Sequence, residues 1–124
     1  MAIKQISSDE IQAFKENLNK SEVMIKSGDM SSFVDLDAEF HELLARASGS
    51  QRLLKLILAH RSEMLRYRIK SLHRTDTASI AVAGHSRVFE CLVKKDASGI
   101  KSAIRDHIDQ AKKYILLYAF EEND

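Results

Sequence analysis

The 124-residue chain contains no proline, no tryptophan and only four glycines. Proline interrupts helices, and glycine weakens the interior of helices and strands. Their scarcity, beside abundant Ala, Leu, Ile, Lys and Glu, favours helix throughout the chain. No pattern indicates strands, internal repeats or a second domain. We therefore expect one all-α domain over residues 1–124.

Other absences limit the class of protein. Cys91 is the sole cysteine, which excludes an internal disulfide and fits a reducing compartment. The net charge is +1, whereas a domain that binds nucleic acid over a whole surface is plainly basic. No apolar run reaches transmembrane length, and no signal peptide heads the chain. We expect a cytoplasmic protein that makes no membrane contact.

Capping residues and apolar periodicity predict about five helices. Ser7 opens a capping box at the start of the first helix, and Gly28 ends that helix. Asp29 and Gly49 bound the second helix in a similar way, and Asp96 is the expected N-cap of the last. The predicted helices cover about 8–27, 30–47, 50–72, 77–95 and 97–120. Short connections imply antiparallel neighbours and hence an antiparallel helical bundle.

The stretch from Asp37 to His41 carries the main clue to function. Residues four apart on a helix share one face, with Cβ atoms roughly 5–6 Å apart, so this carboxylate and imidazole can both contact one metal ion. Neighbouring apolar residues place the pair on the inner face of its helix. His85 and His107 lie on the apolar faces of two later helices. One Asp and three His are therefore predicted to point into a single core.

Two interpretations of these four residues are open from the residues alone. A buried ionised carboxylate is costly unless it is paired or coordinated, which favours a cation held by all four side chains. Alternatively, Asp37 and His41 form an ion pair, while His85 and His107 are hydrogen-bonded core residues. If a metal binds, imidazole ligands favour a divalent transition metal, with zinc first and nickel or manganese next.

Two arginines are candidates for binding an anion. Arg61 and Arg68 share a stripe with leucines on the predicted helix at 50–72. A guanidinium on such a face can hold a carboxylate through two hydrogen bonds. The alternative is that both side chains extend to the surface or pair with a partner subunit.

Several short motifs follow one another in a particular order. They are Gly28-Asp29, Asp37-Ala-Glu-Phe-His41-Glu-Leu-Leu44, Ala47-Ser-Gly49, His85, Asp96 and Asp106-His107. His41 and His85 are 44 residues apart, and His85 and His107 are 22 apart. In these motifs and spacings the chain resembles the effector-binding FCD domain of FadR-type GntR transcriptional regulators. Ser50 and Gly84 depart from the family pattern, which usually has Asn at the first position and often an acid at the second.

The resemblance implies an antiparallel helical bundle whose central cavity binds small organic acids. It also maps a family metal site onto Asp37, His41, His85 and His107. In the family, a further helix and a DNA-binding winged helix-turn-helix domain precede this region. We find neither in the sequence, and so expect an effector domain that acts on DNA only through a domain absent from this chain. The resemblance also implies a homodimer.

The leading hypothesis is a domain that senses a small carboxylic acid with a bound metal, controls DNA binding and catalyses no reaction. One alternative is a metal-dependent enzyme in a helical bundle. An enzyme would need a general base beside the metal, and no acid other than Asp37 lies clearly on an interior stripe. The other alternative is a purely structural dimerisation domain with hydrogen-bonded histidines.

Overall fold

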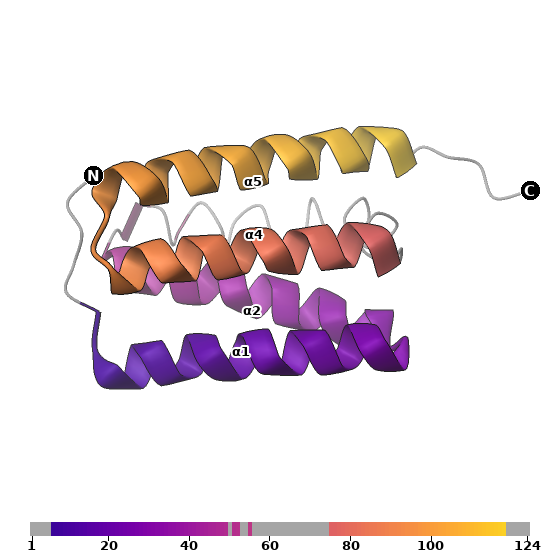
Figure 1. The fold of residues 1–124 in the computed structure, drawn as a ribbon, viewed down its shortest axis with the longest axis horizontal. Helices are drawn as coiled ribbons and strands as arrows, with labels where there is room; N and C mark the ends of the chain where they lie inside the picture. The colour runs from indigo at the N-terminus through magenta and orange to yellow at the C-terminus, as the bar shows by residue number, and fades with distance from the viewer. Residues whose placement is uncertain (1–5, 50, 53–54, 56–74, 119–124) are drawn as a thin grey trace, which may run out of the picture.

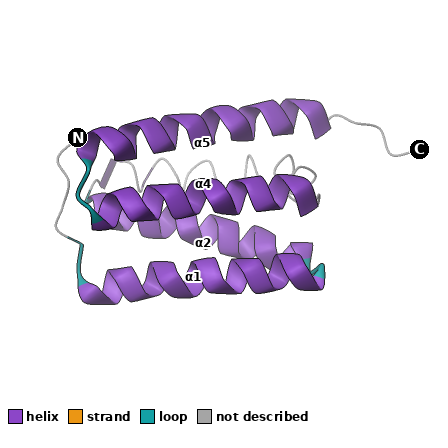
Figure 2. Ribbon diagram, viewed as in Figure 1, coloured by secondary structure: helices purple, strands orange, loops and turns teal. Residues whose placement is uncertain are grey.

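The computed structural model describes residues 6–49, 51–52, 55 and 75–118, and the regular elements in these ranges are all helices (Figures 1 and 2). They are α1 (Ser8–Ser27), α2 (Met30–Ser48), α4 (Thr75–Val93) and α5 (Ala97–Tyr118). The all-α prediction is confirmed. The helix expected at 50–72 lies outside the described residues apart from Gln51, Arg52 and Lys55, which are helical. A count of about five helices therefore stays a prediction. None of the described helices has the length and apolarity needed to cross a bilayer.

The caps predicted for α1 and α2 are present. Ser7 Oγ accepts the Glu10 N–H at 3.1 Å, and Glu10 Oε1 accepts the Ser7 N–H at 3.0 Å, which completes the capping box. Gly28 ends α1 in the left-handed region, with φ of 79°, and the Asp29 carboxylate accepts a backbone N–H in the first turn of α2. Gly49 ends α2 with φ of 73°. The local sequence thus fixes both ends of these two helices.

The predicted bounds of α4, 77–95, are wrong by two residues at each end. At its start, Asp76 lies in the first helical turn, where the helix dipole favours an acid, and not in the preceding loop. Its end was missed because Lys95 adopts the left-handed conformation, with φ of 56°, that usually marks a glycine. Asp96 then caps α5, as predicted, by accepting the Gly99 N–H at 2.9 Å.

The helices form two antiparallel pairs. α1 and α2 are joined by the Gly28 turn, and α4 and α5 by the turn at Lys95. Figure 1 shows α4 between α5 and the first pair, and α4 packs against both α1 and α2. This arrangement is the antiparallel bundle that the short connections predict.

The apolar core consists of two clusters. One contains Phe14, Phe40, Ala47, Val88, Leu92, Ile100 and Ala103. The other contains Met30, Phe33, Val34, Ala78 and Val82. Asp37 on α2 and His85 on α4 each lie, along their own helix, between members of the two clusters. Because they are only 2% and 0% exposed, two polar side chains are enclosed in the middle of the bundle.

Candidate metal centre

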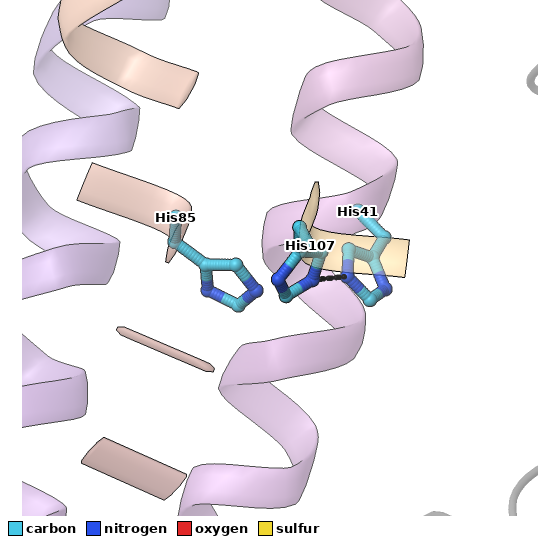
Figure 3. A group of neighbouring side chains, drawn as sticks. All are labelled: His41, His85 and His107. Atoms are coloured by element: carbon cyan, nitrogen blue, oxygen red, sulfur yellow. Dashed lines mark hydrogen bonds between the residues drawn. The ribbon is translucent and has the colours of Figure 1, made fainter. Parts of the chain in front are cut away.

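Three imidazoles from three helices meet inside the bundle (Figure 3). His41 comes from α2, His85 from α4 and His107 from α5. Each offers a ring nitrogen, and these three atoms all lie within 4.8 Å of one another. The helix pairings described above produce this convergence, because α4 lies next to both α2 and α5. We call these three residues the histidine cluster.

The rings of the histidine cluster are inclined to one another. Their centroids are 4.7 Å apart for His85 and His107, 5.4 Å for His41 and His85, and 5.5 Å for His41 and His107. The interplanar angles for these pairs are 63°, 78° and 61°. Each pair is therefore T-shaped, and no two rings of the cluster stack face to face.

Two pairs of atoms that could bind a metal ion are especially close. His41 Nε2 and His107 Nε2 are 3.3 Å apart, and His85 Nε2 lies 3.3 Å from Asp37 Oδ1. The two facing imidazole nitrogens can share one hydrogen bond if one carries the proton, or can both direct lone pairs at a cation. Asp37 therefore pairs with His85 on the neighbouring helix, whereas the alternative drawn from the sequence paired it with His41 on its own helix.

Phe40 fixes the plane of the buried His85 ring. The two rings are stacked, with centroids 4.0 Å apart and planes within 5° of parallel. Nothing in the sequence signals the stack, because the two residues lie on different helices and their contact depends on how α2 packs against α4.

Burial determines the charge state of His41. The loss of hydration disfavours the imidazolium, and the pKa falls from its ordinary 6.5 to about 4. The ring is therefore neutral near pH 7 and keeps a lone pair. A neutral imidazole is the form that binds metal ions, so no proton must leave His41 before coordination at that pH.

The donor set fits a divalent transition metal. Zinc takes imidazole and carboxylate ligands at about 2.0–2.1 Å, and neighbouring ligands of a zinc tetrahedron are then about 3.3–3.4 Å apart. The two closest donor pairs, His41–His107 and Asp37–His85, are each separated by 3.3 Å. Both separations match that spacing, the three imidazole nitrogens lie within 4.8 Å of one another, and Asp37 lies beside them as the fourth candidate.

The FCD domain family matches residues 1–110, which is most of the chain. The chain belongs to the FCD domain family. The resemblance seen in the sequence motifs is thereby confirmed.

Curated relatives of this FCD domain are named as regulators of transcription. The HTH-type transcriptional repressor RspR of Escherichia coli (strain K12) is 21% identical over 123 residues, or 99% of this chain and 54% of the relative. An HTH-type transcriptional regulator in an unstable DNA locus of Streptomyces ambofaciens is 29% identical over 83 residues, or 67% of this chain and 35% of the relative. The chain spans about half the length of the E. coli relative. No solved structure gives a significant match.

The predicted site residues of the FCD domain divide into two groups. The structure brings His41, His85 and His107 together and places Asp37 against His85. Arg61 and Arg68, the candidates for holding an anion, lie outside the described residues. The structure therefore gives the relative positions of the four predicted metal ligands, and the role of the two arginines stays a prediction.

Proposed function

We propose that this FCD domain is the ligand-sensing part of a transcriptional regulator, and that Asp37, His41, His85 and His107 hold one divalent transition metal. Zinc is the first candidate, and nickel or manganese come next. The observation that carries the proposal is the convergence of three imidazoles from three helices, of which His85 is buried and His41 and His107 are half-buried. Where a site excludes water, the lower dielectric constant strengthens the electrostatic interactions made there.

The metal would connect helices that are distant in sequence. Its ligands belong to α2, α4 and α5, so binding stabilises the packing in which these helices are correctly spaced. A metal with three imidazole ligands and one carboxylate can keep open coordination positions, and these suit the oxygen atoms of a small carboxylic acid. Arg61 and Arg68 are proposed to bind the same acid by hydrogen bonds.

Sensing requires that the acid prefer one bundle geometry over another. The difference between its affinities for the two geometries is the free energy available to change DNA binding. The relatives carry the term HTH-type in their names, and the chain covers about half of the E. coli protein. We therefore propose that DNA is bound by a helix-turn-helix part of the whole regulator, and that the regulator is a cytoplasmic homodimer.

A catalytic function is less well supported. An enzyme with this metal would need a free general base close to it. The acidic residues nearest in sequence to the cluster are engaged elsewhere: Glu39 accepts a hydrogen bond from Asn17, and Glu42 pairs with Arg46. Asp106 is exposed and pairs with an arginine on α4. Binding without turnover is the function we propose.

Metal titration of the purified chain tests the metal part of the proposal. Calorimetry with Zn²⁺, Ni²⁺ and Mn²⁺ should give about one site per chain. His85→Ala and His107→Ala should remove that site, whereas Arg87→Ala, at an exposed position on α4, should keep it. Retention of the site in both histidine variants would exclude this ligand set, and absence of any site in the parent chain would leave hydrogen-bonded histidines as the better interpretation.

Thermal-shift screening tests the sensing part. Small carboxylic acids should stabilise the metal-loaded protein, and at a concentration 100 times Kd the gain is about 2.7 kcal/mol. The same acids should have much less effect after the metal is removed with a chelator. Consumption of an acid during the screen would instead favour an enzyme.

A further inference from the structure

Asn17 is a polar residue of α1 that lies almost completely buried against α2. It is 1% exposed, and its side-chain amide group carries two N–H donors. Asn17 Nδ2 donates to the Leu36 carbonyl and to Glu39 Oε1, each at 2.9 Å. Both acceptors belong to one turn of α2, and Asp37 lies between them in the sequence. A buried amide of α1 therefore holds the turn of α2 that carries Asp37.

The hydrogen bond to Leu36 acts on the backbone directly next to Asp37. The Leu36 carbonyl and the Asp37 N–H belong to the same peptide group, which is planar and rigid. Because α2 is helical from Met30 to Ser48, this carbonyl also accepts the N–H of Phe40, and its second lone pair receives the Asn17 amide. Asn17 thus fixes, from the side of α1, the peptide group that leads into Asp37.

The two acceptors also determine which way the amide of Asn17 faces. A carbonyl and a carboxylate can only accept hydrogen bonds, so the NH₂ group faces Leu36 and Glu39, and Asn17 Oδ1 faces away from them. That oxygen is buried and has no hydrogen-bond partner within the described ranges. A buried acceptor without a donor lowers stability. The contribution of asparagine at this position is therefore the two hydrogen bonds that it donates to α2.

Asp37 depends on the position of α2 because its side chain contacts a different helix. Asp37 is 2% exposed, and its Oδ1 lies 3.3 Å from His85 Nε2 on α4. Rotation or sliding of α2 against α4 would change that separation. α1 contributes none of the four proposed metal ligands, but it packs against both α2 and α4 (Figure 1). A hydrogen-bonded link from α1 to the turn around Asp37 opposes such a movement.

We infer that Asn17 is a positioning residue for Asp37: its two hydrogen bonds hold the turn 36–39 of α2 where the Asp37 carboxylate reaches His85. The effect on metal binding rests on the function proposed above, whereas the effect on the contact between Asp37 and His85 does not. Asn17 would contact no metal and would act only through Asp37.

The substitution Asn17→Leu separates this role from a general role in stability. Leucine has a similar size and removes the unpaired oxygen, the Leu36 carbonyl keeps its helical hydrogen bond, and the exposed Glu39 can be hydrated. Denaturant unfolding of the metal-free variant should therefore give a stability close to that of the parent. Zn²⁺ affinity should nevertheless fall by about 10–100-fold, the range seen when support around a metal ligand is lost.

Ser21→Ala is the matched control. Ser21 lies one turn after Asn17 on α1, is also 1% exposed, and has a hydroxyl group without a hydrogen-bond partner in the part of the chain that the structure describes. Its replacement removes a buried polar group but no contact with α2, so Zn²⁺ affinity should stay at the parent value.

A double-mutant cycle tests whether Asn17 acts through Asp37. In an Asp37→Ala background, Asn17→Leu should cause no further loss of Zn²⁺ affinity, because the carboxylate that it misplaces is absent. A loss that adds fully to that of Asp37→Ala would overturn the inference. Asn17→Ala, which introduces no larger side chain, repeats the cycle if the leucine variant does not fold.

Nuclear magnetic resonance of the metal-free protein tests the inference without any metal. Asn17→Leu should shift the ring signals of His85, because Asp37 moves relative to that ring, whereas Ser21→Ala should leave them in place. Unmoved His85 signals, or equal Zn²⁺ affinity in the parent and Asn17→Leu, would overturn the role of Asn17 while the proposed function stands. A parent chain that binds no metal, with His85 signals that still shift, would remove the proposed metal site and retain the positioning role.

Discussion

Replacing Phe40 by leucine should damage the bundle and the histidine cluster together. Phe40 is fully buried, stacks on His85 at 4.0 Å and meets Phe14 edge-on at 5.4 Å. Leucine keeps much of the apolar volume, so the cost is smaller than the 3–5 kcal/mol typical of Phe→Ala. Phe40 also has a more distant ring contact with His41, with centroids 6.2 Å apart. The two closer contacts at about 0.5–1.5 kcal/mol each, with a small cavity, give a loss of about 2–3 kcal/mol.

Phe14→Leu is the matched comparison. Phe14 is also fully buried and contacts two rings, those of Phe40 and Phe89, with centroids 5.4 Å and 5.5 Å away. Denaturant unfolding should therefore give a similar loss of stability for both variants. Calorimetric titration with Zn²⁺ should separate them: affinity should fall about tenfold or more for Phe40→Leu, because His85 loses the ring that holds its plane, and stay close to the parent value for Phe14→Leu.

Two results would contradict this prediction. If both variants lose stability while their Zn²⁺ affinities stay equal to that of the parent, the stack does not orient His85 for binding. If Phe14→Leu weakens Zn²⁺ binding as strongly as Phe40→Leu, the effect arises from general loosening of the core.

Three further predictions follow from single side chains. Asp37→Asn should lower Zn²⁺ affinity by about tenfold or more in calorimetry, because it removes the negative charge 3.3 Å from His85; unchanged affinity would exclude Asp37 as a ligand. Ser7→Ala should lower the free energy of unfolding by about 1 kcal/mol in denaturant titration, because it breaks the cap of α1, and no loss would contradict that role. The free energy of unfolding of the metal-free protein should fall by up to about 3 kcal/mol as the pH falls from 6.5 to 4. In this range His41 binds a proton in the unfolded state but not in the folded state, where burial lowers its pKa to about 4. Unfolding measured across this range should show a weaker pH dependence in His41→Gln, and an identical dependence would assign the effect to other groups.

Local chemistry made much of the fold predictable. Ser7, Gly28, Asp29 and Gly49 act within one turn of their own positions, so the ends of α1 and α2 can be read from short segments. The end of α4 could not be read in this way. Lys95 adopts a left-handed conformation that its residue type does not favour, so no residue type in the local sequence marks this end.

The residues that form the site could be predicted from the sequence, whereas most of the contacts between them could not. Helical periodicity places His41, His85 and His107 on inward faces, and the structure brings them together. Periodicity does not determine how two helices pack across a core. The pairing of Asp37 with His85 and the stack of Phe40 on His85 are contacts of that kind, and they depend on how the helices are assembled.

Anomalous diffraction from crystals of the chain grown with Zn²⁺ tests the central claim most directly. We predict one ion within the bundle, bonded to nitrogens of His41, His85 and His107 at about 2.0–2.1 Å, with a carboxylate oxygen of Asp37 as a further ligand. An ion bound elsewhere, or a bundle in which these side chains point apart while the zinc signal is absent, would contradict the claim.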